Sequence, residues 1–132
     1  MTADFRYCYQ YPKADHTVDV VVFGLSLEST RLQVLLIERG RAGEPYCGSW
    51  ALPGGFVDII NRETSLVAAH RELKEETGIE AAYIEQLYTF DEPDRDPRGR
   101  VISTAFFALV KPEDVTLEAA DDAGDRHRSE MA

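Results

Sequence analysis

Three glutamates close together near position 75 are the residues of this chain best suited to chemistry. Glu72, Glu75 and Glu76 are spaced i, i+3 and i+4, so their carboxylates share one face of a helix. Like charges at this spacing repel each other, and acids near a helix C-terminus also face the negative end of the helix dipole. Mg²⁺ or Mn²⁺ would relieve both penalties, because these hard cations prefer carboxylate oxygens. The alternative is a solvated helix face on which Arg71 and Lys74 offset the charge locally.

The residues that precede the cluster favour the cation site. Trp50–Asp58, Glu63 and Arg71–Ile79 together resemble the signature of the Nudix hydrolase family. That signature has a Gly, five residues, a Glu and seven residues, followed by Arg-Glu-apolar-x-Glu-Glu-x-Gly-apolar. Its second half matches at every fixed position, and the resemblance covers about residues 17–120. The resemblance implies a Nudix-type α/β/α sandwich with a mixed β-sheet.

The resemblance also implies a role for each matching residue. The three helical glutamates would hold one or more Mg²⁺ or Mn²⁺ ions, with the backbone carbonyl of Gly55 as a further ligand. Arg71 would orient the cluster by pairing with Glu63 or Glu75. The implied reaction is hydrolysis of a nucleoside diphosphate linked to another moiety, by metal-activated water that attacks phosphorus. Glu72, or a glutamate outside the metal's immediate ligands, would accept the proton.

One loop departs from the family pattern, because seven residues separate Gly55 from Glu63 where the family has five. If Gly55 is aligned, Asn61 takes the position of the glutamate; if Glu63 is aligned, Val57 takes the position of the glycine. We favour a two-residue bulge in the loop before the helix, with both ends keeping their roles. Asp58 is a possible substitute carboxylate in this loop.

Within the family, the run Leu52–Asp58 looks most like ADP-ribose pyrophosphatases, and Asp96–Ser103 resembles a segment of the same subgroup. We therefore expect hydrolysis of ADP-ribose to AMP and ribose 5-phosphate. One alternative is a pyrophosphohydrolase that removes oxidised nucleoside triphosphates. Another is a non-catalytic sensor of an ADP-ribose-type ligand, against which the complete carboxylate cluster argues.

Several basic and aromatic residues are candidates for contacts with the substrate. Arginines suit phosphate and ribose oxygens because their planar guanidinium donates paired hydrogen bonds, and an aromatic ring can stack on a base. The candidates are Arg39, Arg41, Arg98, Arg100 and Phe90, with Phe56 as the alternative stacking residue.

The clearest element that would position these residues is a helix over Ser65–Thr77. Thr64 suits its N-cap and Gly78 suits the left-handed residue just past its end. Apolar residues at helical spacing would face the core. They are Leu66, Ala69, Leu73 and Ile79.

Short apolar runs around this helix predict strands, because β-branched residues dominate runs too short for typical helices. The alternation of strands with one strong helix favours a layered α/β domain. The expected extended segments are Val18–Leu25, Arg31–Glu38, Trp50–Leu52, Phe56–Val57, 82–90 and 101–110.

The two ends of the chain lack the strand and helix patterns of its middle part. We expect an N-terminal arm over residues 1–16, a domain over 17–120 and a flexible tail over 121–132. Family members usually continue into a further strand and a C-terminal helix, which we expect to be missing here. A missing strand would expose a sheet edge, so we expect a homodimer.

Composition narrows the partners and the compartment. The chain has 132 residues, with 14 Lys plus Arg against 24 Asp plus Glu, and a formal net charge of −10. This acidity argues against a partner that is duplex DNA or an anionic membrane, because both need a basic face. A nucleotide sugar remains possible, provided that a cation offsets the repulsion. Two cysteines and the lack of a signal peptide or apolar span predict a reducing, cytoplasmic location.

Overall fold

The structure is a computed structural model that describes residues 7–40, 46–112 and 129–132. These residues contain one helix and seven strands. In chain order the elements are β1 (Asp15–Ser26), β2 (Arg31–Glu38), β3 (Trp50–Ala51), β4 (Gly54–Phe56), α1 (Ser65–Thr77), β5 (Ile84–Phe90), β6 (Val101–Val110) and β7 (Ser129–Met131). In the described part of the chain, the helix is neither long nor apolar enough to cross a membrane.

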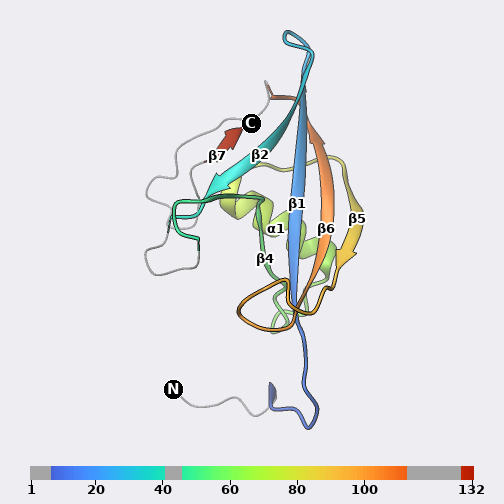
Figure 1. Cartoon of the computed structure of the whole chain (residues 1–132). Helices are drawn as coiled ribbons and strands as arrows, with labels where there is room; N and C mark the ends of the chain where they lie inside the picture. The colour runs from blue at the N-terminus through green and yellow to red at the C-terminus, as the bar shows by residue number, and fades with distance from the viewer. Residues whose placement is uncertain (1–6, 41–45, 113–128) are drawn as a thin grey trace.

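The strands form a mixed sheet built around β1, which is the long blue strand in Figure 1. The order along the main path is β3-β2-β1-β6-β5, and β6 runs parallel to β1 along most of its length. The other edge of β1 is shared between two antiparallel neighbours. β4 pairs with Thr17–Asp19, and β2 pairs with Phe23–Ser26. The sheet therefore divides into two branches on this side of β1.

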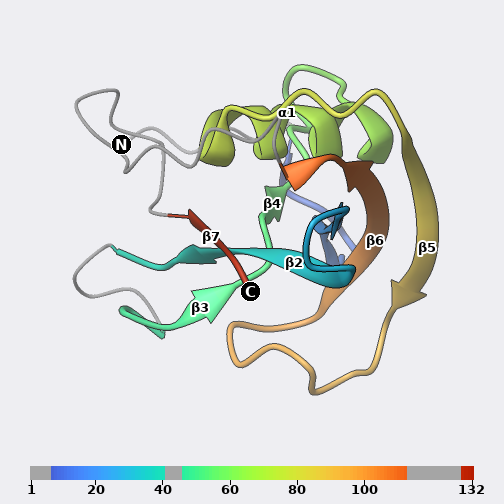
Figure 2. The same ribbon diagram turned by 90° about the horizontal axis from the view of Figure 1, so that it is seen from above.

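Alternate residues of β1 build the core between the sheet and α1, which covers one face of the sheet (Figure 2). Val18, Val20 and Val22 are fully buried and form a cluster with Leu73 of α1 and Phe106 of β6. Because successive strand residues point to opposite faces, Thr17 and Asp19 lie on the other side of the sheet. β1 thus presents an apolar face to the helix and a partly polar face away from it.

The helix α1 has the predicted bounds and caps. The Thr64 hydroxyl accepts a hydrogen bond from the backbone N–H of Val67 at 3.2 Å, and Gly78 has a left-handed φ of 77°. The expected apolar stripe needs one correction. Leu66 is 45% exposed, because it lies in the first turn, and burial on the helix begins only at Ala68.

Most of the expected strands are confirmed, and three differ in their starting residue. β4 covers Gly54–Phe56 where Phe56–Val57 was expected, because Gly54 and Gly55 already pair with Asp19 and Val18 of β1. β1 begins at Asp15, inside the expected N-terminal arm, because its first residues already pair with β6 and the Asp15 N–H donates to the Arg100 carbonyl at 2.9 Å. β5 begins at Ile84, two residues later than expected.

The C-terminal end of the chain corrects the expectation of a flexible tail over 121–132. Ser129–Met131 form β7, which pairs antiparallel with Leu35–Ile37 of β2, and Met131 packs against the core. The chain therefore returns to the sheet at its last residues. The rest of the expected tail, residues 121–128, and residues 113–120 before it lie outside the described residues.

Candidate metal centre and ligand pocket

The last two turns of α1 carry the acidic cluster, and the depth of its members differs. Glu72 is largely buried, with 14% of its side chain exposed, whereas 48% of the Glu75 side chain is exposed. Glu76 lies deeper than Glu75 and accepts a hydrogen bond at Oε2 from the backbone N–H of Gly54 at 2.9 Å. The three carboxylates therefore lie on one side of α1, next to β4.

Arg71 connects this helix to the preceding loop through several donors of its guanidinium. Nε and Nη2 donate to the two carboxylate oxygens of Glu63 at 2.6 and 2.8 Å. Nη1 donates to Glu72 at 2.8 Å and to Glu75 at 3.1 Å, and Nη2 also donates to the Phe56 carbonyl at 3.0 Å. Both expected partners of Arg71 are thus in contact with it. These hydrogen bonds raise the pKa of Arg71 and lower the pKa of Glu63.

The loop before α1 accommodates its two extra residues by closing on itself. The Asp58 N–H donates to Glu63 Oε1 at 2.9 Å, and the Glu63 N–H donates to the Asp58 carbonyl at 3.0 Å. The Asp58 carboxylate accepts from the backbone and side chain of Asn61. Asp58 therefore braces the loop and does not replace Glu63. Glu63 keeps the partner position for Arg71, as the favoured interpretation of a bulge requires.

Two glycines allow β4 to pass closely between α1 and β1. A β-carbon at Gly55 would collide with the carboxylate of Glu72, and a β-carbon at Gly54 would collide with the backbone carbonyl of Val18. At Gly54 only glycine leaves the required space, because the obstructing atom is a backbone oxygen; at Gly55 a side chain would push the carboxylate of Glu72 out of its position. The predicted ligand residue Gly55 is thus directly beside the predicted ligand residue Glu72.

Burial controls the electrostatics of the cluster. It raises the pKa of Glu76 to about 8, although the Gly54 N–H and the charge of Arg39 partly offset this effect. Burial also raises the pKa of Glu72, while the hydrogen bond and charge of Arg71 act in the opposite direction. Burial therefore makes the ionised forms of Glu72 and Glu76 less stable, and a nearby cation would offset this cost.

These residues fit a hard divalent cation by the chemistry of their donors. They offer carboxylate oxygens in a partly desolvated position, next to a glycine that leaves room for close approach. Among the described residues, no three acidic, histidine or cysteine side chains converge as a ready-made metal site. Instead, protein donors hold the carboxylates: Arg71 holds Glu72 and Glu75, and Gly54 holds Glu76.

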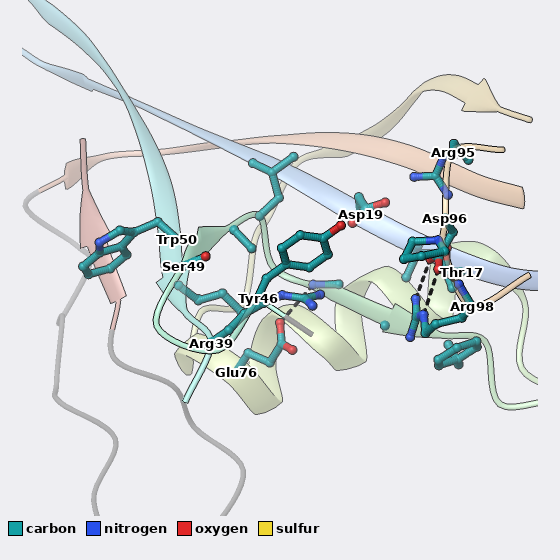
Figure 3. A pocket seen from close by; sticks show the side chains of 18 residues that line it. Thr17, Asp19, Arg39, Tyr46, Ser49, Trp50, Glu76, Arg95, Asp96 and Arg98 are labelled. Carbon is teal, nitrogen blue, oxygen red and sulfur yellow. Dashed lines mark hydrogen bonds and ion pairs between the residues drawn. The ribbon is translucent and has the colours of Figure 1, made fainter. Parts of the chain in front are cut away.

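A pocket with a volume of about 540 Å³ opens beside the cluster (Figure 3). Its wall comes from the start of β1, the end of β2, β3, β4, α1 and the loop between β5 and β6. Glu76 lines this pocket, so the acidic cluster and the pocket are continuous. The two branches of the sheet, β4 on one side and β2 with β3 on the other, contribute opposite parts of the wall.

The predicted substrate-binding residues divide into three groups. Arg39 and Arg98 line the pocket, as does the alternative stacking residue Phe56. Arg100 and Phe90 do not line it; the Phe90 ring packs edge-on against Tyr88 with centroids 5.1 Å apart. Arg41 lies outside the described residues.

Arg98 is held at the pocket by two contacts that come from opposite sides. Its guanidinium lies 5.1 Å from the centre of the Phe56 ring, and it donates to the carboxylate of Asp96 at 2.7 and 3.0 Å. These hydrogen bonds lower the pKa of Asp96. The arginine is therefore placed over an exposed aromatic face at one end of the pocket.

Several pocket residues were not anticipated from the sequence. Tyr46 and Trp50 are exposed aromatic residues in the wall, and Figure 3 shows the Tyr46 ring between Arg39 and Asp19. Their exposure depends on how loops meet in space, which no local pattern encodes. Asp19 did carry a signal, because it is the one charged residue within the apolar run Val18–Leu25.

The fold combines a mixed sheet with one covering helix, and the end of that helix carries the acidic cluster beside the pocket. The NUDIX domain family matches residues 15–128, so the chain belongs to the NUDIX family. Among solved structures, it is similar to a MutT/nudix family protein from Enterococcus faecalis, with 40% identity and a TM-score of 0.77 over 94% of this chain and 45% of that one. The NUDIX domain of Shewanella oneidensis NrtR, cocrystallised with ADP ribose, is 29% identical with a TM-score of 0.73, over 96% of this chain and 79% of that one.

Two curated relatives differ in what they do. The chain is 42% identical to the ADPR responsive transcriptional repressor NtrR of Acinetobacter baylyi, over 76% of this chain and 41% of that protein. It is 45% identical to the ADP-ribose pyrophosphatase of Methanocaldococcus jannaschii, over 69% of this chain and 50% of that protein. The chain thus spans half or less of the length of these curated relatives.

Proposed function

We propose that this chain is a metal-dependent Nudix pyrophosphatase that hydrolyses ADP-ribose to AMP and ribose 5-phosphate. The observation that carries the proposal is the acidic cluster of α1, complete and continuous with a pocket that contains arginines and aromatic residues. The similarity to an ADP-ribose pyrophosphatase, and to a NUDIX domain cocrystallised with ADP ribose, supports the choice of substrate.

Glu72, Glu75, Glu76 and the Gly55 carbonyl would hold Mg²⁺ or Mn²⁺. When bound, such a cation supplies positive charge that offsets the diphosphate and makes an attacking water more acidic. Arg71 positions the cluster, because it bonds two of the glutamates and is itself fixed by Glu63. Glu72, or a glutamate outside the metal's immediate ligands, would accept the proton of the water.

Arg39 and Arg98 would bind the ligand from the two ends of the pocket. The net charge of −10 makes such local positive charge necessary for an anionic substrate. Phe56 offers an exposed ring for stacking, which Arg98 already partly covers. The expected roles of Arg100 and Phe90 stay predictions that the pocket does not support, and the role of Arg41 stays a prediction for a residue outside the described part of the chain.

Product analysis tests this proposal. The purified chain is incubated with ADP-ribose and Mg²⁺ or Mn²⁺, with EDTA as the metal-free control. We expect AMP as a product, lost with EDTA and lowered by several orders of magnitude in Glu76→Gln. Glu80→Gln is the matched control, because Glu80 lies on the surface in an ion pair with Lys74. Activity of Glu76→Gln within a factor of about three of wild type would contradict the metal assignment.

The similarity to NtrR supports a second candidate, a domain that binds ADP-ribose as a regulatory signal. This reading predicts binding of ADP-ribose without AMP release, even with metal present. The nucleoside triphosphatase alternative predicts release of pyrophosphate from a triphosphate. The same product analysis, extended to nucleoside triphosphates, therefore separates all three candidates.

A homodimer is the remaining part of the proposal. β5 is the last strand on its side of the described sheet, and Leu87, Tyr88 and Phe90 on it are exposed. An edge strand with exposed apolar side chains suits pairing with a second copy. Sedimentation velocity at several protein concentrations tests this expectation, and a monomer at every concentration would contradict it.

A further inference from the structure

A carboxylate stands on the pocket side of the sheet where its neighbours would allow an apolar residue. Asp19 lies in the middle of β1, and the paired strand β6 places Ala105 opposite it. Ser103 of β6 is fully buried and donates its hydroxyl hydrogen bond to Asp19 Oδ2. Ser103 is the one donor to this carboxylate in the part of the chain that the structure describes. The other oxygen, Oδ1, has no such partner there.

The position of Asp19 relative to the acidic cluster is set by Gly54. A β-carbon on Gly54 would lie 3.0 Å from Asp19 Oδ1, while the N–H of the same glycine donates to Glu76. Asp19 and Glu76 therefore contact the same residue of β4 from different directions. Both line the same pocket.

Packing and stability alone do not explain why the pocket face of β1 carries an acidic residue, Asp19. The opposite face of β1 shows what packing alone selects, because Val18, Val20 and Val22 are all apolar and fully buried. A hydrogen-bonded Asp–Ser pair in a sheet stabilises little beyond what an apolar pair of similar size provides. An acid also repels the phosphates that the rest of the pocket would attract. It suits a part of the ligand that is uncharged and donates hydrogen bonds.

We propose that Asp19, held by Ser103, recognises the vicinal hydroxyl pair of a ribose in the ligand. This inference rests on the proposed function, since it places the diphosphate at the acidic cluster of α1. A ribose is bonded directly to that diphosphate, so its hydroxyls would lie within reach of a group one strand away. A carboxylate accepts hydrogen bonds from two adjacent hydroxyls, as acidic residues do in dinucleotide-binding folds.

The test compares ligands that differ by one hydroxyl. ADP-ribose, its analogue with a 2′-deoxy adenosine, its analogue with a 2-deoxy terminal ribose, and inosine diphosphate ribose are assayed for KM and kcat with metal. Their Kd is measured by calorimetry in EDTA. Three variants accompany the wild type: Asp19→Asn, Ser103→Ala and, as a matched control on the same strand, Asp15→Asn, which is exposed and outside the pocket.

We expect Asp19→Asn to weaken ADP-ribose binding by about tenfold to a hundredfold, the range for a hydrogen bond to a charged group, with kcat changed little. One of the two deoxy analogues should bind the wild type weakly, and Asp19→Asn should weaken its binding little further. The ribose that lacks a hydroxyl in that analogue is the one that Asp19 contacts. Ser103→Ala should show a smaller effect, because the acid remains but loses its positioning hydrogen bond. The melting temperature of Asp19→Asn should match the wild type, since an amide oxygen still accepts from Ser103.

Four results would overturn the inference or the proposed function on which it rests. Equal Kd for ADP-ribose in Asp19→Asn and wild type would overturn the role of Asp19 while leaving the proposed function intact. If Asp19→Asn weakens the binding of ADP-ribose but not of inosine diphosphate ribose, Asp19 recognises the adenine base and not a ribose. Binding without hydrolysis in the wild type would contradict the proposed function alone, because the Kd comparison still tests Asp19. A wild type that binds none of the four ligands would overturn both.

Discussion

Glu76 differs from the other two glutamates of the cluster because burial raises its pKa to about 8, whereas Arg71 donates hydrogen bonds to both of the others. Its neighbour Glu75 is about half exposed, and Glu72 is partly compensated by Arg71. The spacing of the three residues in the sequence treats them as equals. Only the packing of β4 against the helix shows that Gly54 covers one of them.

This difference predicts how the metal-free protein responds to pH. Because the folded pKa of Glu76 is raised from 4.5 to about 8, the folded state binds this proton more tightly than the unfolded state does. The free energy of unfolding should therefore fall as the pH rises from about 4.5 to about 8, and the contribution is fully present only below that window. Urea denaturation in EDTA at pH 5.5 and pH 8.5 measures it.

The variant Glu76→Gln provides the control for this measurement. Glutamine does not titrate, so the variant should lose less stability than the wild type between the two pH values. Identical pH profiles for the two proteins would show that Glu76 is not the group responsible.

At the scale of elements, α1 shows that local sequence signals predict where a helix begins and ends better than they predict which of its residues are buried. Both ends of Ser65–Thr77 were predicted to the residue, because the N-cap side chain and the left-handed glycine each act within a few residues of the helix end that they mark. The inward stripe was less accurate, since Leu66 is exposed. Which turn of a helix reaches the core depends on the position of the sheet, and the sequence of the helix does not contain that information.

Replacing the cap should therefore separate stability from activity. Thr64→Ala removes the acceptor for the Val67 N–H and should lower the free energy of unfolding by about 1 kcal/mol. Because the carboxylates lie at the other end of the helix, kcat should stay close to the wild-type value. Thr64→Ser, which keeps the hydroxyl, is the control. A large loss of activity in a folded Thr64→Ala protein would mean that the cap also sets the geometry of the cluster.

The loop before α1 shows how an insertion can leave a site intact. The reciprocal hydrogen bonds between Asp58 and Glu63 close the longer loop, so Glu63 still reaches Arg71. The sequence alone left two alignments open. The choice between them depended on whether Asn61 or Glu63 contacts Arg71, and the contact that forms, with Glu63 eight positions earlier, is established only by folding.

At the scale of the whole molecule, the return of the chain to the sheet is the feature that sequence reasoning missed. Residues 129–131 carry no strand pattern, yet they pair with β2, more than ninety positions earlier in the chain. A short polar segment gains its structure from the partner edge and not from its own composition. The pocket wall was likewise only partly predictable, because it combines one strand edge with loops that are distant in sequence.

The last strand should contribute measurably to stability. Met131 packs against the core and its side chain lies next to Gly24, so Met131→Ala should lower the free energy of unfolding by about 1–2 kcal/mol, less than for a fully buried methionine. Urea denaturation measures the change. Glu130→Ala, an exposed residue on the same strand, is the control. An unchanged midpoint in Met131→Ala would mean that β7 does not hold this position in solution.

The two glycines of β4 also decide where the ligand preference of this domain can be altered in the laboratory. A side chain at Gly54 meets a backbone carbonyl that cannot move away, and one at Gly55 displaces the carboxylate of Glu72, a proposed metal ligand, so random mutagenesis there should yield damaged proteins and not new specificities. Variation is open instead at Tyr46 and Phe56, which face the same pocket and are exposed. A library for a new nucleotide should therefore leave β4 fixed at its glycines and diversify the aromatic rim.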